Sequence, residues 1–528
     1  MTTAYDADVL VLGAGPNGLT AAAMLAGAGL DVIVLEAADA VGGAVRTDEV
    51  TLPGYRHDTF SGFYPFSRVG PISALPLERY GLEWANFDRP YGGGTPTGVG
   101  FALERTLPAT RQAIQKRQPA DLPGWDELWR AWQRLGPGLL DLLFHPLGDL
   151  PPLLKLGLRF LPLGSAFALQ QLLAAPARSI AERLFQSEDA RVWFIGSARH
   201  SDLLPEALGG AMLALVLGGL AQDVGMPIPR GGAQAIPDAL RRCLEDRGGR
   251  VHTGARVEHV LTHRGRAVGA HTAAGDVYAR RAVLSTIEPQ QLFLRLLDER
   301  LLPEEFVRAV RQFEWGVGTF RLDCALSALP TFRVEALNGV GVLHLGESTD
   351  SLSLTASQAH SGLLPDHPFM IVGLHTLADP SRAPAGGHTL WIESHAPAHI
   401  RGDALGRITT TDWARARESF ADRLLEEMDR YAPGVRTLIL ARQARSPLDL
   451  AHANANLVHG DIAGGSMSLH QQLVFRPVPG WFRHRTPVPG LYLGGASTHP
   501  GAGVHGACGA NAARVLLGDL GRARRARW

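Results

Sequence analysis

The amino-terminal stretch constrains the fold of this chain more than any other part of the sequence. Asp8–Leu12 is a short, almost wholly apolar run rich in valine and leucine, which is typical of a strand covered on both faces. It leads directly into Gly13–Gly18 and then into Leu19–Leu30, whose alanines and leucines favour a helix. A second apolar run, Asp31–Leu35, ends at Glu36. This order of strand, glycine loop, helix, strand and acid predicts a βαβ unit that binds a dinucleotide.

The residue types in this unit each have a physical reason. Gly13 permits the tight turn, Gly15 lets the backbone approach a pyrophosphate, and Gly18 allows the helix to pack closely on the strand. The helix offers free N–H groups and the positive end of its dipole to that pyrophosphate. Glu36 can accept hydrogen bonds from a ribose 2′-hydroxyl, which disfavours the 2′-phosphate of NADP. The residues expected to contact the nucleotide are Gly13, Gly15, Pro16, Asn17, Gly18, Glu36 and Ala37.

A double glycine after the second strand favours FAD over NAD. Gly42 and Gly43 let the chain lie close along a second part of a long cofactor. The pair resembles the double-glycine motif of the large flavoprotein group that contains amine oxidases and phytoene desaturases. Many members of that group carry an arginine directly after the glycines, whereas this chain has Ala44 there and Arg46 two residues later. Arg46 is accordingly either a cofactor contact or an ordinary surface arginine.

A second informative segment lies near the carboxyl end. Leu491–Leu493 predicts a short buried strand, and the glycines that follow it let a ligand approach the backbone. Pro500–Gly503 predicts a turn, and His505–Leu517 predicts a helix. Beside a flavin, the N–H groups at the start of such a helix would stabilise negative charge on the N1/C2 carbonyl region of the reduced ring. That arrangement favours oxidation of a substrate by oxidised flavin.

This segment is similar to the carboxy-terminal signature of phytoene desaturases and related carotenoid dehydrogenases. Together with Gly460–Gln471 and Arg476–Gly480, it looks even more like the branch called pyridine nucleotide-disulfide oxidoreductase domain-containing protein 2. The resemblance implies FAD bound without a covalent link, with an apolar substrate above its ring. It also implies cofactor contacts at the glycine loop, Glu36, Gly43, Val257, Ala496 and Val504. The predicted cofactor residues further include Ala44, Gly495 and Gly503.

These separated stretches predict an α/β fold around a discontinuous, Rossmann-like FAD-binding domain of the amine-oxidase type. Residues 1–90, 225–300 and 455–528 would form that domain. Residues 91–224 contain long Leu/Ala-rich segments and would form a helical cap, either as ordinary core helices or as a membrane-facing region. Residues 301–454 would form an inserted α+β substrate domain.

The inserted domain is expected to hold a sheet and one long amphipathic helix. The helix would span Thr411–Tyr431, with Thr411 or Asp412 as its cap and the following Pro-Gly pair as its end. Five runs predict its strands: Gly318–Ala325, Val340–Leu345, Ser351–Ala356, Met370–Leu377 and Leu390–Ser394.

Three histidines near the carboxy-terminal segment are candidate proton acceptors for the redox step. His470, His499 and His505 have side chains whose usual pKa lies near working pH, and His505 is best placed because it begins the predicted helix. A single histidine is, however, more often structural than catalytic. Many amine oxidases that this chain resembles use a lysine near the flavin, but the only lysines here are Lys116 and Lys155, outside any matching motif.

Composition limits the partners and the compartment. Lys+Arg and Asp+Glu both number 51, so the chain lacks the cationic excess of a nucleic-acid binder. Its three cysteines are far apart, which predicts neither disulfides nor a cysteine-based metal site and fits a reducing, cytoplasmic location. No signal peptide is expected. The basic tail from Arg522 to Arg527 is either solvated or a tether to anionic lipid, so peripheral membrane contact is a second expectation.

The leading hypothesis is an FAD-dependent oxidoreductase that moves hydride from an apolar substrate, with carotenoid-like polyenes as one candidate, to N5 of the flavin. The chain has no second strand–GxGxxG–helix unit for a resident NAD(P), so electrons would leave to oxygen, a quinone or another diffusible acceptor. Three alternatives stay open: a flavin amine oxidase, a non-redox FAD-dependent isomerase of a lipophilic substrate, and a catalytically idle FAD-binding scaffold.

Overall fold

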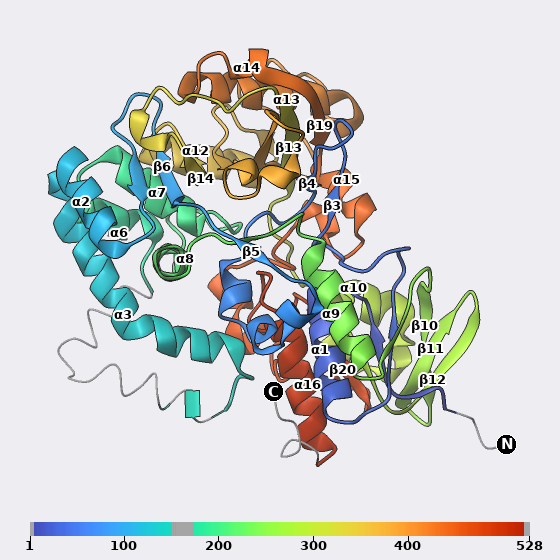
Figure 1. The fold of residues 1–528 in the computed structure, drawn as a ribbon. Helices are drawn as coiled ribbons and strands as arrows, with labels where there is room; N and C mark the ends of the chain where they lie inside the picture. Colours follow the sequence, from blue (N-terminus) through green and yellow to red (C-terminus); the bar gives the residue numbers. More distant parts are fainter. Residues whose placement is uncertain (1–4, 150, 153, 155–173, 522–528) are drawn as a thin grey trace.

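The computed structural model describes residues 5–149, 151, 152, 154 and 174–521 (Figure 1). Two large sheets organise these residues, and the chain passes between them more than once. In Figure 1 the first sheet lies at the bottom beside helices α1 and α16, and the second lies at the top under α13. A group of helices, drawn in cyan and green, flanks the second sheet.

The first sheet, called here the nucleotide sheet, gathers parallel strands from distant parts of the chain. Its parallel order is β20 (Leu491–Leu493), β12 (Gly275–Ser285), β1 (Ala7–Leu12), β2 (Val32–Leu35) and β9 (Arg250–His252). Two antiparallel strands extend it beyond β12, namely β11 (Arg266–Thr272) and β10 (Val257–His263). Strands 491–493 and 7–12 therefore lie on either side of β12 although they stand at opposite ends of the sequence.

Helices cover one face of the nucleotide sheet, which explains why its central strands are so apolar. Val9 and Val11 of β1 pack against the helices α1 (Pro16–Gly27), α9 (Ala235–Asp246) and α16 (Ala507–Asp519). Leu10 and Leu12, on the opposite face, belong to a separate core that includes residues of α11 (Glu304–Arg311). Alternation along a strand thus buries every side chain of β1 except that of Asp8, which is partly buried.

The second sheet, called here the substrate-domain sheet, is mostly antiparallel. Its order is β19 (Ile439–Arg445), β13 (Thr319–Leu326), β17 (His388–His395), β16 (Met370–Gly373), β14 (Val340–Leu345), β6 (Arg89–Gly94) and β7 (Phe101–Leu103). One face is apolar and packs on α13 (Trp413–Tyr431). The other face meets α7 (Glu188–Ala198) and α8 (Gly210–Asp223).

The remaining elements are helices of the cap region and short connecting pieces. The cap helices, besides α7 and α8, are α2 (Leu107–Arg117), α3 (Leu122–Phe144) and α6 (Ala177–Leu184). The connecting pieces are β3 (Thr47–Asp48), β4 (His57–Asp58), β5 (Trp84–Ala85), β8 (Ile228–Pro229), α10 (Pro289–Gln291), α12 (Thr349–His360), β15 (Leu363–Leu364), β18 (Gly402–Asp403), α14 (Val435–Leu438) and α15 (Pro447–Ala453). No helix among the described residues combines the length and the apolar character that crossing a bilayer requires.

The predicted boundary at residue 91 is wrong, because β6 and β7 belong to the substrate-domain sheet rather than to the cap. β6 contains three successive glycines, which weakened its pattern as a strand. A Cβ on Gly93 would lie 2.7 Å from the carbonyl oxygen of His344 and 3.1 Å from the Cα of Trp193. The glycines therefore let α7 approach the sheet closely.

The predicted strand at Ser351–Ala356 is also wrong, since this run lies inside α12. The side chain of Ser348 accepts a hydrogen bond from the N–H of Ser351 and so caps the helix. Leu352, Ala356 and Ala359 are buried at helical spacing. The other four predicted strands overlap β13, β14, β16 and β17, although β16 ends at Gly373.

The long helix of the inserted domain is confirmed as α13, and Asp412 is its cap through a hydrogen bond from the N–H of Ala414. The carboxy-terminal helix α16 begins at Ala507, two residues later than predicted. The basic tail at 522–527 lies outside the described residues, and so do residues 150, 153 and 155–173 of the predicted helical cap.

Candidate functional site

A single cavity of about 750 Å³ lies at the carboxyl ends of β1, β2 and β12, where ligands bind in sheets of this type. It continues from the glycine loop past residues 60–66 to the cap helices α3 and α8. The cavity is thus long enough to involve both the nucleotide sheet and the substrate-domain sheet. Each segment predicted to bind the cofactor reaches its wall.

The glycine loop is packed so tightly that side chains are excluded. A Cβ on Gly18 would lie 2.0 Å from the carbonyl oxygen of Gly13, so only glycine lets α1 begin here. Gly13 has φ +99°, which favours glycine. A Cβ on Gly43 would lie 3.2 Å from the Cα of Gly15, so the double glycine and the glycine loop touch through their backbones. Together they form a narrow cradle of main-chain atoms.

Glu36 holds the second strand to this cradle. Its carboxylate accepts hydrogen bonds from the N–H of Ala14 at 2.7 Å and from the N–H of Ala38 at 2.9 Å. Glu36 follows the last residue of β2 and lines the cavity. The carboxylate is therefore fixed at the position where the sequence predicts a ribose contact.

The structure brings every predicted cofactor residue to this one cavity. These lining residues are Gly13, Gly15, Pro16, Asn17, Gly18, Glu36, Ala37, Gly43, Ala44, Arg46, Val257, Gly495, Ala496, Gly503 and Val504. Arg46 also pairs with Asp48 at 3.2 Å, and its side chain is about one-third exposed. Direct contact of each residue with the cofactor stays a prediction.

The lining suits FAD in two respects. The Oδ1 atom of Asn17 is buried without a hydrogen-bond partner among the described residues, so the loop has an acceptor left for a ligand. The first residues of α1 and the residues just before α16 both line the cavity, so two helix N-termini face it. Helix N-termini favour negative charge, which a dinucleotide pyrophosphate and a reduced flavin ring both carry.

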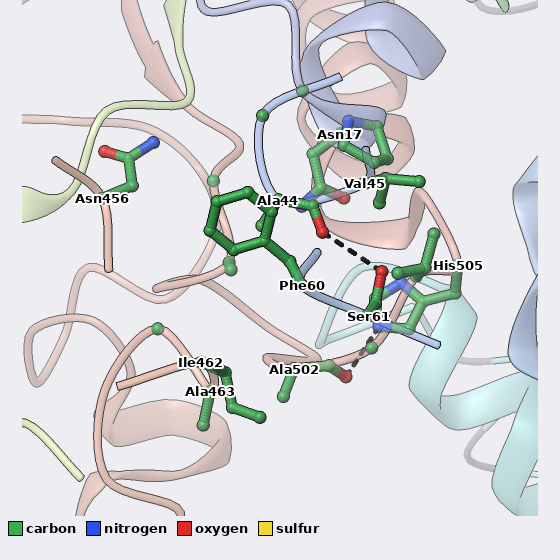
Figure 2. Close-up of a pocket in the computed structure, with 18 of the residues that line it drawn as sticks. Asn17, Ala44, Val45, Phe60, Ser61, Asn456, Ile462, Ala463, Ala502 and His505 are labelled. Atoms are coloured by element: carbon green, nitrogen blue, oxygen red, sulfur yellow. Dashed lines mark hydrogen bonds between the residues drawn. The ribbon is translucent and has the colours of Figure 1, made fainter. Parts of the chain in front are cut away.

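His505 is buried at the cavity but does not fit the predicted role of proton acceptor. Its Nδ1 accepts a hydrogen bond from the N–H of Ala507 at 2.9 Å, and its Nε2 lies 3.1 Å from the carbonyl oxygen of Ala502 (Figure 2). Burial lowers its pKa to about 4. Both ring nitrogens are therefore used by the backbone, and the residue holds the turn that precedes α16.

The other two candidate histidines differ in position. His499 lines the cavity, its Nε2 lies 3.1 Å from the carbonyl oxygen of Leu142, and burial lowers its pKa to about 4. His470 is largely exposed, pairs with Glu314 at 3.1 Å and is not part of the cavity wall. The structure therefore separates His470 from the other two.

Several lining residues escaped the sequence analysis. Figure 2 shows Phe60, Ser61, Asn456, Ile462 and Ala463 around the same space as Asn17 and Ala44. The hydroxyl of Ser61 donates to the carbonyl of Ala44 at 3.1 Å and so ties the 60–66 loop to the double glycine. Ile462 and Ala463 lie within Gly460–Gln471, whose resemblance was noted without a role for either residue, and the others lie in loops that only tertiary packing brings to the cavity.

Arg476 positions two of these loops. Its guanidinium is fully buried and donates to the carbonyls of Ala463 at 2.9 Å, Gly464 at 2.8 Å and Ala496 at 2.9 Å. Because an arginine carries five donors in a rigid plane, one side chain can hold several carbonyls at once. The 463–464 loop is thereby fixed against the carboxy-terminal glycine segment.

Two further residues of the cavity wall come from the middle of the chain. His200 follows α7, and Glu393 lies on β17 beside Trp391. Both carry titratable groups, and neither stands in a recognisable motif. The available signal was the pair Glu393 and His395, two residues apart in a strand with an apolar centre, which places two polar side chains on one face.

Comparison with known proteins agrees with this architecture. Residues 17–320 match the family described as flavin containing amine oxidoreductase. The chain is 30% identical to pyridine nucleotide-disulfide oxidoreductase domain-containing protein 2 of Mus musculus over 97% of this chain and 94% of that protein. It is 24% identical to the phytoene desaturase (neurosporene-forming) of Cereibacter sphaeroides over 99% of this chain and 97% of that protein.

A solved structure of a putrescine oxidase double mutant has the same fold, with a TM-score of 0.60 and 17% identity over 97% of this chain and 98% of that chain. The family match covers more than half of the sequence, and the relatives align along nearly its full length. FAD is accordingly the cofactor that the cradle and the two helix N-termini serve. The chain belongs to the flavin containing amine oxidoreductase family and is an FAD-dependent oxidoreductase.

Proposed function

We propose that this chain is a dehydrogenase that takes a hydride and a proton from adjacent carbons of a lipophilic substrate and leaves a carbon–carbon double bond. Polyenes are one candidate class, since a relative along the full chain is named phytoene desaturase. The observation that carries the proposal is the apolar wall of the cavity beyond the cofactor cradle. Oxygen or a quinone would serve as the final electron acceptor.

The apolar wall comes from three segments that converge on the cavity. The end of α3, the helix α8 with the residues before it, and the 462–473 loop all contribute aliphatic side chains. These side chains are Leu139, Leu142, Leu143, Leu203, Leu208, Met212, Leu213, Val216, Leu217, Ile462, Met467, Leu469 and Leu473. Such a surface binds hydrocarbon because burial of apolar area is favourable by about 25 cal/mol per Å².

The chain's own residues prepare the site for this reaction. FAD, when bound, supplies the acceptor for the hydride. The apolar wall excludes water from the substrate, and the N-terminus of α16 places positive potential at the cavity. His505 keeps that helix start in place through its bond to Ala507. Arg476 fixes the 463–464 loop against the segment that contains Ala496.

Amine oxidation is the second candidate, and the family match favours it. Lys116, however, is exposed on α2 and does not line the cavity, whereas Lys155 lies outside the described residues. The long aliphatic wall also suits a hydrocarbon better than a small, strongly hydrated amine. These observations support the dehydrogenase over the amine oxidase.

The test is anaerobic reduction of the bound FAD, followed through the loss of its visible absorption. The purified holoenzyme is mixed with polyene hydrocarbons, fatty-acyl compounds and primary or secondary amines. The proposal expects bleaching by a lipophilic compound, with an unsaturated product that lacks two hydrogens. Bleaching by amines alone would establish the amine oxidase, and conversion without any bleaching or acceptor would establish an isomerase.

We also propose that the cavity mouth contacts a lipid surface. Leu208, Leu469 and Leu473 line the cavity and are largely exposed, and Val474 and Phe475 extend the same apolar patch. Leu469 lies directly against the segment after Leu208, since a Cβ on Gly209 would be 3.1 Å from its Cδ2. A lipophilic substrate held in a bilayer could then enter the cavity without crossing water. Leu208, Leu469, Leu473, Val474 and Phe475 together form the mouth patch.

A further inference from the structure

The inner wall of the cavity carries buried polar groups among apolar side chains, whereas the wall formed by α3 and α8 is aliphatic. One face of the substrate-domain sheet forms this wall, and Val342, Trp391 and Glu393 line the cavity from it. The pairing register explains their common face, because Gly373 of β16 pairs with both Trp391 and Val342. Glu393 stands two residues beyond Trp391 and so points to the same side.

Glu393 is buried and has few hydrogen-bond partners. The residue is 5% exposed, and its nearest partner is Nη1 of Arg321 at 3.5 Å. Arg321 itself donates to the carbonyl of Asp58 at 2.9 Å and to Asp323 at 3.1 Å. The Nη1 atom that faces Glu393 also donates to the carbonyl of Phe60 at 3.1 Å, and Glu393 has no further hydrogen-bond partner among the described residues.

The charges around Glu393 are balanced without it. Asp323 pairs with Arg321 and Arg445, and Arg382 pairs with Asp58 and Asp379. Three arginines thus face three aspartates, so Glu393 shares Arg321 with Asp323 and has no arginine of its own. Burial raises the pKa of Glu393, mainly because desolvation disfavours the carboxylate. A neutral carboxyl group presents an O–H donor to the cavity.

His200 is the second polar group that lines the cavity without a partner. Its Nε2 is buried and lacks a hydrogen-bond partner among the described residues. Burial lowers its pKa to about 4, so the ring is neutral and one nitrogen is an acceptor. His344 packs against it with ring centroids 4.7 Å apart and is itself held by the hydroxyl of Tyr91 at 3.0 Å.

Contacts connect these two groups along the same sheet face. Arg199, the neighbour of His200, lies with Nη2 3.1 Å from Nδ1 of His395. His395 stands two residues beyond Glu393 on β17 and therefore on the same face. The inner wall thus holds a buried carboxyl group whose nearest partner lies at 3.5 Å and a buried imidazole nitrogen without a partner, which is costly unless a ligand completes them.

We propose that the substrate of this cavity is an amphipathic molecule with a neutral oxygen-bearing head group, a hydroxyl or a carbonyl, that hydrogen-bonds with Glu393 and His200. Its hydrocarbon part lies along the aliphatic wall of α3 and α8. This inference rests on the lipophilic cavity of the proposed function and defines the class of substrate further. A pure hydrocarbon leaves both polar groups unsatisfied, and an ammonium group calls for an ionised carboxylate.

The experiment compares binding of three probes to the FAD-loaded enzyme: 1-octanol, n-octane and n-octylamine. Binding is read from the shift of the flavin absorption band and from the thermal unfolding midpoint, so turnover is not required. Glu393→Leu and His200→Leu are each expected to weaken the binding of 1-octanol by about tenfold, which corresponds to about 1.4 kcal/mol. Both variants are expected to leave n-octane binding unchanged. Glu393→Gln keeps a neutral donor and retains the affinity for 1-octanol.

The exposed pair His470 and Glu314 offers matched controls, because neither residue lines the cavity. His470→Leu and Glu314→Leu are expected to leave the binding of all three probes unchanged. Failure of 1-octanol to bind, or unchanged 1-octanol affinity in the Glu393 and His200 variants that retain FAD, would overturn the inference. The inference would also be overturned if n-octylamine bound more tightly than the other two probes and Glu393→Gln abolished its binding. Failure of the proposed function would appear separately, as no bleaching by any lipophile.

Discussion

At the scale of single residues, Gly18 carries the sharpest steric requirement of the cofactor cradle. Its missing side chain leaves room for the carbonyl of Gly13, which a Cβ would approach to 2.0 Å. We expect Gly18→Ala to displace the loop and to purify with less than a tenth of the FAD of the wild type. The flavin-to-protein absorbance ratio measures this.

The control for Gly18 is Gly518, a glycine inside α16 that a Cβ would leave without any contact within 4 Å. Gly518→Ala should keep its full FAD and gain up to about 1 kcal/mol of stability from helix propensity. Full FAD occupancy of the Gly18→Ala protein would show that the cradle tolerates a side chain and that close packing at Gly18 is not required for FAD binding.

The pH dependence of stability tests the buried histidines, of which His484 is one. Burial lowers its pKa to about 4, against the opposing effect of the Leu493 carbonyl at 3.0 Å. The unfolded chain takes up the proton near pH 6.5. Between these values the unfolded state binds more protons, so the free energy of unfolding falls as the pH drops from 6.5 to 4.

His484→Asn removes this titration, and asparagine tolerates the left-handed backbone of position 484, whose φ is 62°. We expect the slope of unfolding free energy against pH to decrease by up to about 1.4 kcal/mol per pH unit within this window. Denaturant unfolding at several pH values measures the slope. An identical slope in both proteins would mean that His484 does not titrate differently on folding.

Prediction from sequence worked best where the adjacent strand or turn explains why a particular residue type stands at a position. Gly43 and Glu36 follow the strand β2 at fixed spacing, so their place in the cavity wall could be predicted. Glu393 and His200 could not, because they reach the cavity only through the pairing of β17 with β16 and the packing of α7. His505 was predicted in the right place, but its role depends on backbone partners that no sequence pattern specifies.

At the scale of elements, the two wrong predictions have one cause in common. A short local pattern was interpreted without the rest of its element or the element that packs against it. Ser351–Ala356 lacks the period of a helix over so few residues, and only the whole of α12 shows its buried stripe. The segment Gly92–Gly94 has little strand propensity, yet close packing of β6 against α7 requires glycine there. The strands β1 and β2 of the nucleotide sheet, in contrast, are almost wholly apolar and were easily predicted.

Several elements meet through the buried side chain of Arg382. It donates to Asp58 of β4 at 2.7 Å, to Asp379 at 3.1 Å and to the carbonyl of Pro229 at 3.0 Å. Removal of one member of a buried ion pair leaves an uncompensated charge and typically costs about 3–5 kcal/mol. We expect Arg382→Met to lose about this much stability in denaturant unfolding of the holoenzyme.

An exposed pair provides the comparison for Arg382. Arg407 lies 3.4 Å from Glu426, and both side chains are more than half exposed. Arg407→Met should therefore cost less than about 1 kcal/mol. Equal losses in the two variants would show that burial of the Arg382 cluster does not strengthen the connection between these elements.

At the scale of the whole molecule, the mouth patch predicts association with lipid. We expect the holoenzyme to sediment with vesicles of phosphatidylcholine and phosphatidylglycerol. Replacing Leu473 and Phe475 together by serine should weaken this association by about tenfold or more, because apolar area is removed. Leu354→Ser, a change of an exposed leucine on α12 that does not line the cavity, should have no effect. Wild-type protein that stays in the supernatant would contradict the proposal.

The central claim is that three stretches far apart in the sequence surround one FAD molecule. Gly15, Val257 and Val504 line the same cavity although they belong to three separate pieces of the chain. The most direct measurement is a crystal structure of the FAD-loaded protein. It should show one non-covalent FAD per chain with its pyrophosphate at Gly15, its adenine beside Val257 and its ring beside Val504. An FAD bound elsewhere, or one that contacts the glycine loop without the other two stretches, would contradict the account.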